Sequence, residues 1–160
     1  MEIRNLISYS MSKKIIFIII IVLIILVILL NYVSSEFFSL KYWNPIKRVQ
    51  VKNVIVKAET VSSQEKIERG LSARANLGEG RGMLFLMPKD EYQRFWMKGM
   101  EFSLDIIWIE NGRVIGCEGR ISPDDQRIFT SPDKASFVLE VNAGFCDANQ
   151  IQLNDPVKIQ

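Results

Sequence analysis

The sequence contains no histidine. The side chain whose ordinary pKa lies nearest neutrality is therefore missing, and with it the Ser-His-Asp and Cys-His triads of many hydrolases. The commonest ligand of transition metals is missing as well. We therefore expect no metal site and no cofactor, and any acid–base chemistry would fall to Asp, Glu, Lys, Tyr or Cys.

Cysteine is scarce, with only Cys117 and Cys146 and no CxxC motif. This excludes zinc ribbons and thioredoxin-type redox motifs. Two interpretations remain open. The favoured one is a pair of unpaired, apolar thiols. The other is a disulfide between the two, which requires a domain outside the cytoplasm.

Clustered basic charge is also missing. Residues 1–50 hold six Lys or Arg against two Asp or Glu, whereas residues 51–160 hold fourteen against sixteen. The larger part of the chain is thus mildly acidic. A protein that binds nucleic acid would usually carry a basic patch or stripe, so we expect no nucleic-acid partner.

One long hydrophobic run is present, "IIFIIIIVLIILVILL" at residues 15–30. With residues 31–33 it gives nineteen positions, which as a helix would extend about 28 Å, close to the hydrocarbon thickness of a bilayer. The run predicts a single transmembrane helix at residues 15–33. Cleavage as a signal peptide is the alternative, although the run is longer than a usual signal-peptide core.

The charges around this run predict an orientation. Arg4, Lys13 and Lys14 precede it, which favours a cytoplasmic N-terminus at residues 1–14 and a cell-membrane protein with its domain outside. Residues 34–48 would form a juxtamembrane linker and residues 49–160 an extracytoplasmic globular domain. If the segment were cleaved, the protein would be secreted.

The rest of the chain reads as short strands separated by turn signals. Residues 49–58 predict a strand with a bulge near residues 52–53, and residues 83–87 a strand that ends before Pro88. Ser62 and Gly70 bracket a short helix, and Asn142 is a candidate N-cap for a second one. Asn111 and Gly112 predict a hairpin turn. The fold class is mostly β with short helices, a β-sandwich or small barrel-like α+β domain, preceded by the transmembrane helix.

Four stretches together resemble one family: "ERGLS", "GMLFLM", "FWMKGMEFSLDIIWI" followed by "NGRVI", and "FVLEVNAGF". Their order and spacing are similar to the bacterial and archaeal family catalogued as domain of unknown function 192, over residues 51–160. The resemblance implies a compact, mostly-β domain, often behind a signal peptide or anchor, and no particular reaction.

The chain departs from the family pattern at four positions. Members typically read RGLM and FWMKNT followed by a proline before Leu-Asp, whereas this chain has Ser72, Gly99, Met100 and Ser103 there. If the family uses the Asn or Thr of that pattern, this chain would bind differently or lack the site.

Five residues are candidate ligand-binding positions: Trp96, Lys98, Asp105, Glu140 and Asn142. Trp96 and Lys98 would share one strand face, as a platform and a cation, while Phe95 faces the other way. The plainer interpretations are that Phe95 and Trp96 both pack in the core and that Lys98 is solvated. Asp105 and Glu140 are acids inside apolar strands, and such acids need partners.

The acids leave several functions open. Asp105 could be held by Lys98 or by backbone N–H groups, or Asp105 and Glu140 could form a carboxylate pair for hydrolysis. Our main hypothesis is a membrane-anchored module that binds a small molecule or a component of the cell envelope. A histidine-independent hydrolase and a structural or protein-interaction domain are the alternatives, so we lean away from an enzyme.

Overall fold

The structure is a computed structural model that describes residues 15–31 and 44–160. Residues 15–31 are helical, and their apolar side chains are exposed. Within the two described ranges, no helix combines the length and the apolar character needed to cross a membrane. The predicted span ends at residue 33, and its last two residues lie outside the described ranges. Most of the predicted linker and the whole predicted cytoplasmic N-terminus also lie outside them.

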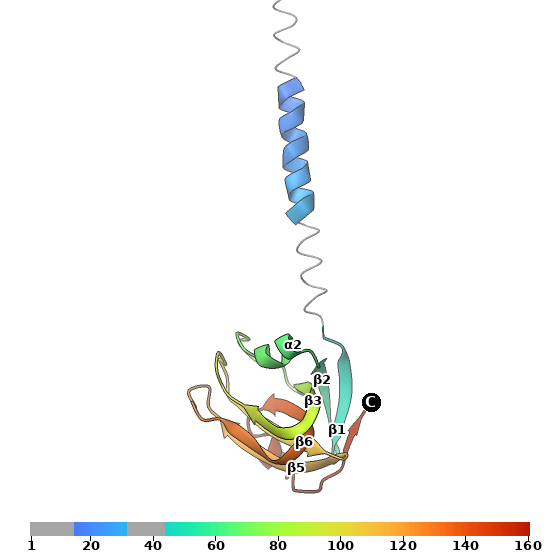
Figure 1. Cartoon of the computed structure of the whole chain (residues 1–160), viewed down its shortest axis with the longest axis vertical. Helices are drawn as coiled ribbons and strands as arrows, with labels where there is room; N and C mark the ends of the chain where they lie inside the picture. The colour runs from blue at the N-terminus through green and yellow to red at the C-terminus, as the bar shows by residue number, and fades with distance from the viewer. Residues whose placement is uncertain (1–14, 32–43) are drawn as a thin grey trace, which may run out of the picture. The chain divides into compact units, whose positions relative to one another are not determined.

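Residues 44–160 form a separate compact unit built on one curled, seven-stranded sheet (Figure 1). The mostly-β expectation is confirmed, and the sheet is a half-barrel rather than a two-layered sandwich. Its strand order is β5-β4-β6-β3-β2-β1-β7. The strands are β1 (Ile46–Val51), β2 (Val54–Val61), β3 (Arg81–Phe95), β4 (Leu104–Glu110), β5 (Arg113–Ile121), β6 (Phe129–Asn142) and β7 (Val157–Ile159).

The two edges of the sheet approach each other at one end. The backbone N–H of Val114 in β5 donates to the carbonyl of Asp155 at 3.0 Å, and the N–H of Asn154 donates to the carbonyl of Val114 at 2.8 Å. Asn154 and Asp155 lie just before β7, separated from it by Pro156. These bonds occupy the backbone groups of Val114 at the start of β5 and tie that edge strand to the segment before β7.

Two predicted boundaries are wrong for the same reason, because strand pairing overrides local signals. The expected bulge at residues 52–53 is a tight turn, and β1 and β2 form an antiparallel hairpin with Val51 opposite Val54. β3 does not stop at Pro88. It runs on to Phe95 and changes register against β6 between Leu86 and Glu91, where the proline needs no ladder hydrogen bond.

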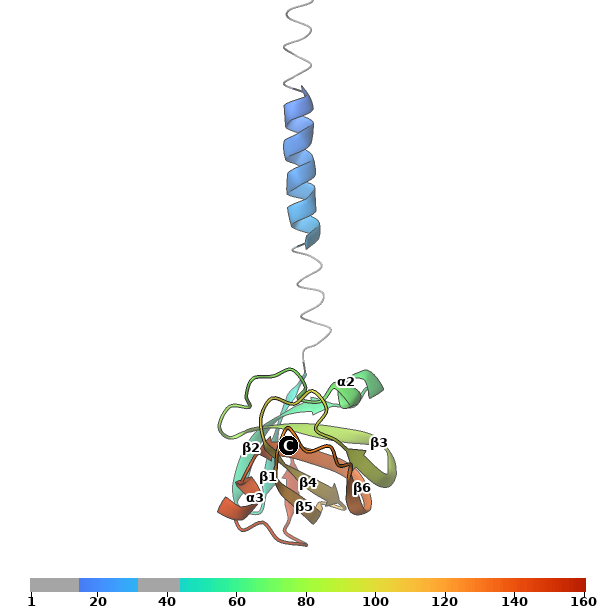
Figure 2. The same ribbon diagram turned by 90° about the vertical axis from the view of Figure 1, so that its left-hand side faces the viewer.

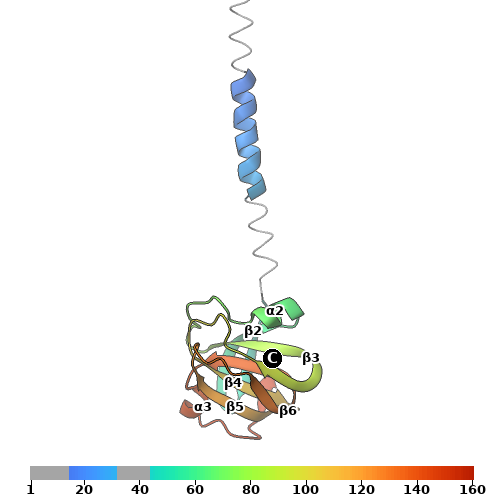
Figure 3. The same ribbon diagram turned by 60° about the vertical axis from the view of Figure 1, so that its left-hand side comes forward.

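Two short helices complete the unit. α2 (Gln64–Arg69) lies in the crossover between the parallel strands β2 and β3, and α3 (Phe145–Ala148) follows β6. Figures 2 and 3 show them at opposite ends of the domain, with α2 beside β3. The expected Gly70 ends α2 with a positive φ of 49°, while the N-cap is Ser63, one residue later than predicted.

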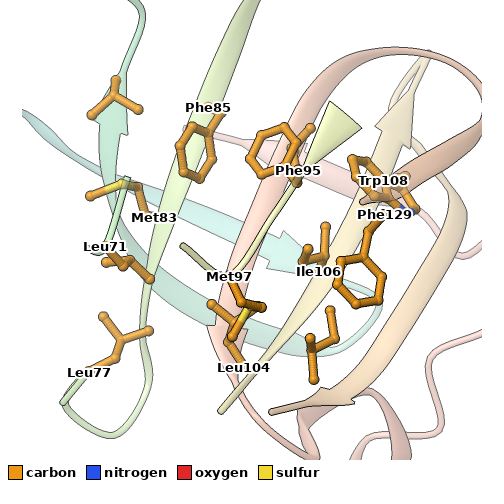
Figure 4. Packing of buried hydrophobic residues seen from close by; sticks show 13 residues of the cluster. Leu71, Leu77, Met83, Phe85, Phe95, Met97, Leu104, Ile106, Trp108 and Phe129 are labelled. Carbon is orange, nitrogen blue, oxygen red and sulfur yellow. The ribbon is translucent and has the colours of Figure 1, made fainter. Parts of the chain in front are cut away.

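Alternate residues of the central strands bury two separate clusters, one on each face of the sheet. Met83, Phe85, Ile106 and Trp108 belong to the first, and their neighbours along the strands belong to the second. In the first cluster the ring of Phe95 lies between those of Phe85 and Trp108, edge-on to both at 4.9 and 5.5 Å (Figure 4). Such edge-to-face pairs add to the stabilisation from burial.

Candidate functional site

A cavity of about 280 Å³ lies between α2, the long strand β3 and the end of β6. It opens onto the face of the sheet that carries the first hydrophobic cluster. Its apolar lining includes Ile67, Leu71, Phe85, Met87, Phe95, Trp96 and Met100. Polar side chains, among them Gln64, Glu68, Arg94 and Glu140, make up a similar share of the lining. A concave site with apolar surface and placed polar groups is the usual form of a small-molecule site, and this volume suits a small ligand.

The shape of β3 creates the hollow. Because the register against β6 shifts twice, between Leu86 and Glu91 and between Tyr92 and Arg94, the strand curls around the cavity and lines it from both halves. α2 covers the hollow and lends Ile67, which is partly buried against the first cluster. The cavity is therefore a product of the sheet's curvature.

Glu140 is the chemically unusual residue of this cavity. It pairs with Met83 on one side and Ile106 on the other, so its side chain shares their apolar face. It is only 6% exposed, it lines the cavity, and its buried Oε2 accepts no hydrogen bond from any described residue. Burial raises its pKa from 4.5 to about 8, since the charged form loses its hydration without gaining a partner.

Asp105 lies on the opposite face of the sheet. It pairs with Val141, one residue beyond Glu140, and a shift of one residue along a strand reverses the face. The structure therefore keeps the two acids apart, and the predicted carboxylate pair does not form. A carboxylate pair for hydrolysis has no geometric basis here.

The carboxylate of Asp105 is held by the backbone, which is one of the two structural partners that the sequence left open. Oδ1 accepts from the N–H groups of Arg120 at 2.7 Å and Gly144 at 2.9 Å, and Oδ2 accepts from that of Cys146 at 2.8 Å. The side chain is fully buried. Three charge-assisted bonds compensate its lost hydration, so Asp105 is a structural tie between β4, β5 and α3.

The two cysteines are joined in a disulfide that links β5 to α3. The favoured expectation of unpaired thiols is therefore wrong, because the curl of the sheet brings together two residues 29 positions apart in sequence. One carboxylate oxygen of Asp105 and both sulfur atoms lie within 4.8 Å of one another. The sulfurs are bonded to each other and the carboxylate is occupied by N–H groups, so this cluster offers no free ligand set for a metal.

Trp96 and Lys98 follow the end of β3. Phe95 is 8% exposed and Trp96 is 49% exposed, so the two rings do face different surroundings and the interpretation that both are core is wrong. Trp96 lines the cavity, whereas Lys98 does not. Lys98 forms no ion pair with Asp105 or with any other residue in the described ranges, which agrees with a solvated lysine.

Asn142 is not the cap of α3. The N-cap is Gly144, whose φ of 84° only glycine adopts easily, and Asn142 is still the last residue of β6. Its side-chain amide donates to the carbonyl of Gly78 at 3.2 Å. Asn142 therefore ties β6 to the loop before β3 and lies outside the cavity lining.

Two departures from the family pattern touch each other. A Cβ placed on Gly99 would lie 3.3 Å from the Cβ of Ser72, and the Ser72 hydroxyl donates to the carbonyl of Lys98 at 3.0 Å. Gly99 has a φ of 76°. After glycine, asparagine tolerates that left-handed region best, so the Asn of the family pattern and the Gly of this chain meet the same backbone requirement.

The sequence-based candidates missed most of the cavity. Of the five, only Trp96 and Glu140 line it, while Leu71, Met87, Tyr92, Arg94 and Met100 were not singled out. The sequence around Ser62 and Gly70 predicted the helix, but no residue pattern in that segment indicated that α2 covers β3. Only the pairing of β3 with β6 brings Glu140 beneath that helix.

Comparison with known proteins agrees with this fold. Two solved structures are similar to the chain, and no curated protein matches it. One is a protein of unknown function from Novosphingobium aromaticivorans, with 25% identity, a TM-score of 0.66 and coverage of 72% of this chain and 84% of that one. The other, from Sinorhizobium meliloti, is described as a "putative transcription regulator", with 22% identity, a TM-score of 0.68 and coverage of 72% and 95%.

The family resemblance read from the four motifs is also confirmed. The model of the domain of unknown function 192 family, described as uncharacterized ACR, matches residues 47–159. That range contains the whole sheet apart from its first residue, both short helices and the cavity. The chain belongs to the domain of unknown function 192 family.

Proposed function

We propose that the globular unit is a binding module for a small molecule that occupies the cavity between α2 and β3 and hydrogen-bonds to Glu140. The observation that carries the proposal is the buried carboxyl group of Glu140, whose Oε2 has no partner among the described residues. Native proteins leave few buried polar atoms without a partner, and a carboxyl group is among the costliest to leave so. A ligand that enters the cavity would supply the missing hydrogen bond.

The apolar part of the cavity wall fits this role. Leu71, Phe85 and Phe95 are buried and shape an apolar surface, while the half-exposed Trp96 adds an aromatic ring to its lining. Apolar surface supplies most of the affinity of a small ligand, and a few placed polar groups fix its orientation. The separation of Asp105 from Glu140 removes the carboxylate pair on which the hydrolase alternative depended.

A fragment screen by ligand-observed NMR tests the proposal. The full chain would be kept in solution with an amphipathic polymer, so that no free detergent competes for the cavity. The fragments should have about ten heavy atoms and cover cations, anions and neutral molecules. Fragments that bind should lose their signal with Met87→Trp, which fills the cavity, and keep it with Leu153→Trp, which alters an exposed residue elsewhere. Equal binding to both variants would refute the cavity as the site.

We also propose that residues 15–33 anchor this module to the cell membrane, with the domain outside. The support is the unbroken apolar run and the basic residues that precede it. A pair of reporters fused after Gln160 tests the orientation. Alkaline phosphatase should be active and a fluorescent protein that fails to mature outside the cytoplasm should be dark; the reverse pattern would contradict the proposal.

A further inference from the structure

The lining of the cavity contains one more carboxyl group than it contains arginines. The titratable residues that line it come from α2, β3 and β6: Glu68, Arg69, Glu91, Tyr92, Arg94 and Glu140. Two acids and two arginines on α2 and β3 offset each other in number. Glu140 is the remaining acid, and it is the buried one, whereas Glu68, Glu91 and Arg94 are exposed.

The surroundings of Glu140 select against an anion. A ligand anion would meet a carboxyl group and the rings of Phe85, Phe95 and Trp96, and it would find no buried cation. A positively charged nitrogen meets complementary groups instead. It can donate to the carboxylate, and aromatic rings attract cations through their quadrupoles.

We propose that the ligand is an organic amine, bound with its ammonium group at Glu140 and its apolar part against Leu71, Phe85 and Phe95. This inference rests on the proposed function, because it names the class of ligand that the cavity takes. The cavity volume of about 280 Å³ limits the ligand to a small amine.

Binding of an amine has a consequence for protons. In the empty cavity the pKa of Glu140 is about 8, so the group is protonated at neutral pH. An ammonium group favours the charged carboxylate, and binding near pH 6.5 should therefore release close to one proton. The affinity should rise several-fold for each pH unit up to about pH 8. A ligand that bound the neutral acid would release none.

Three compounds of matched size separate the ligand classes: phenethylamine, 2-phenylethanol and phenylacetate. Calorimetry with the full chain would measure each affinity in two buffers of different ionisation enthalpy, which gives the number of protons released. We expect phenethylamine to bind about ten-fold more tightly than the alcohol, because hydrogen bonds to charged groups are the stronger ones, and phenylacetate to bind most weakly. Glu140→Gln should remove the advantage of the amine and its proton release while leaving the alcohol bound, which also shows that the variant is folded.

The outcomes distinguish the two proposals. If the alcohol or phenylacetate binds in the cavity as tightly as the amine, or if the amine binds without proton release, the amine inference is overturned and the binding module stands. If Met87→Trp weakens the binding of none of the three compounds, the cavity does not take such molecules and both proposals fail.

Discussion

Alkaline pH should destabilise the folded protein through Glu140. Its carboxyl group has a pKa of about 8 in the folded state, against 4.5 as a free side chain. Below pH 4.5 the group is protonated in both the folded and the unfolded state, so it does not make stability depend on pH. Between pH 4.5 and about 8 the unfolded chain loses the proton while the folded chain keeps it, so stability falls as the pH rises. Above about pH 8 both states are ionised and the loss is complete.

The size of this loss follows from the difference between the two pKa values. Each unit corresponds to about 1.4 kcal/mol, so the free energy of unfolding should fall by roughly 3 to 5 kcal/mol between pH 5 and pH 9. That is a large share of the stability of a domain of this size, about 5 to 15 kcal/mol. Glu140→Gln should remove this contribution, because an amide does not ionise.

Urea denaturation followed by tryptophan fluorescence, repeated from pH 5 to pH 9, measures the effect. The difference between the native chain and Glu140→Gln isolates Glu140 from all other titrating groups. Glu91→Gln changes an exposed acid of the same cavity. It should leave the fall of the free energy of unfolding with pH unchanged, since Glu140 remains. Our reasoning about the buried carboxyl group fails if Glu140→Gln shows the same fall in stability with pH as the native chain.

Three further predictions concern the structural ties and the backbone. Asp105→Asn should lower the free energy of unfolding, measured by urea denaturation, by about 3 kcal/mol, because its amide cannot accept from all three N–H groups. Asp147→Asn, which changes an exposed ion pair with Arg120, should lower it by less than about 1 kcal/mol. Serine at both Cys117 and Cys146 should cost about 3 to 4 kcal/mol, since the closed loop spans 29 residues, and added reductant should no longer lower the melting temperature. Gly99→Asn should be tolerated and Gly99→Val should cost at least about 1 to 2 kcal/mol more, because φ is 76°.

Each of these predictions has an outcome that contradicts it. Equal costs for Asp105→Asn and Asp147→Asn would show that the buried bonds carry no special weight. A native chain whose melting temperature ignores reductant would mean that the disulfide does not contribute to stability. Equal melting temperatures for the Asn and Val variants at position 99 would mean that the left-handed backbone there is not a constraint.

Local signals in the sequence predicted the parts of the fold that depend on neighbouring residues. Asn111 and Gly112 both have positive φ, 50° and 68°, and they join β4 to β5 as the dipeptide indicated. Gly70 ends α2 at the position that the sequence indicated. The apolar surroundings of Asp105 in sequence correctly predicted that it needs a hydrogen-bonding partner. These features are decided within a few residues, so one sequence suffices to predict them.

The tertiary structure alone decided the site. Asp105 and Glu140 look alike in sequence, as single acids within apolar strands, yet one is held by three backbone N–H groups and the other has a buried oxygen without a partner among the described residues. The difference arises because Asp105 pairs with Val141 rather than with Glu140, and a register offset of one residue sends the two side chains to opposite faces. Strand register, and the curl of β3 that opens the cavity, depend on contacts between residues distant in the chain, which periodicity along one segment does not contain.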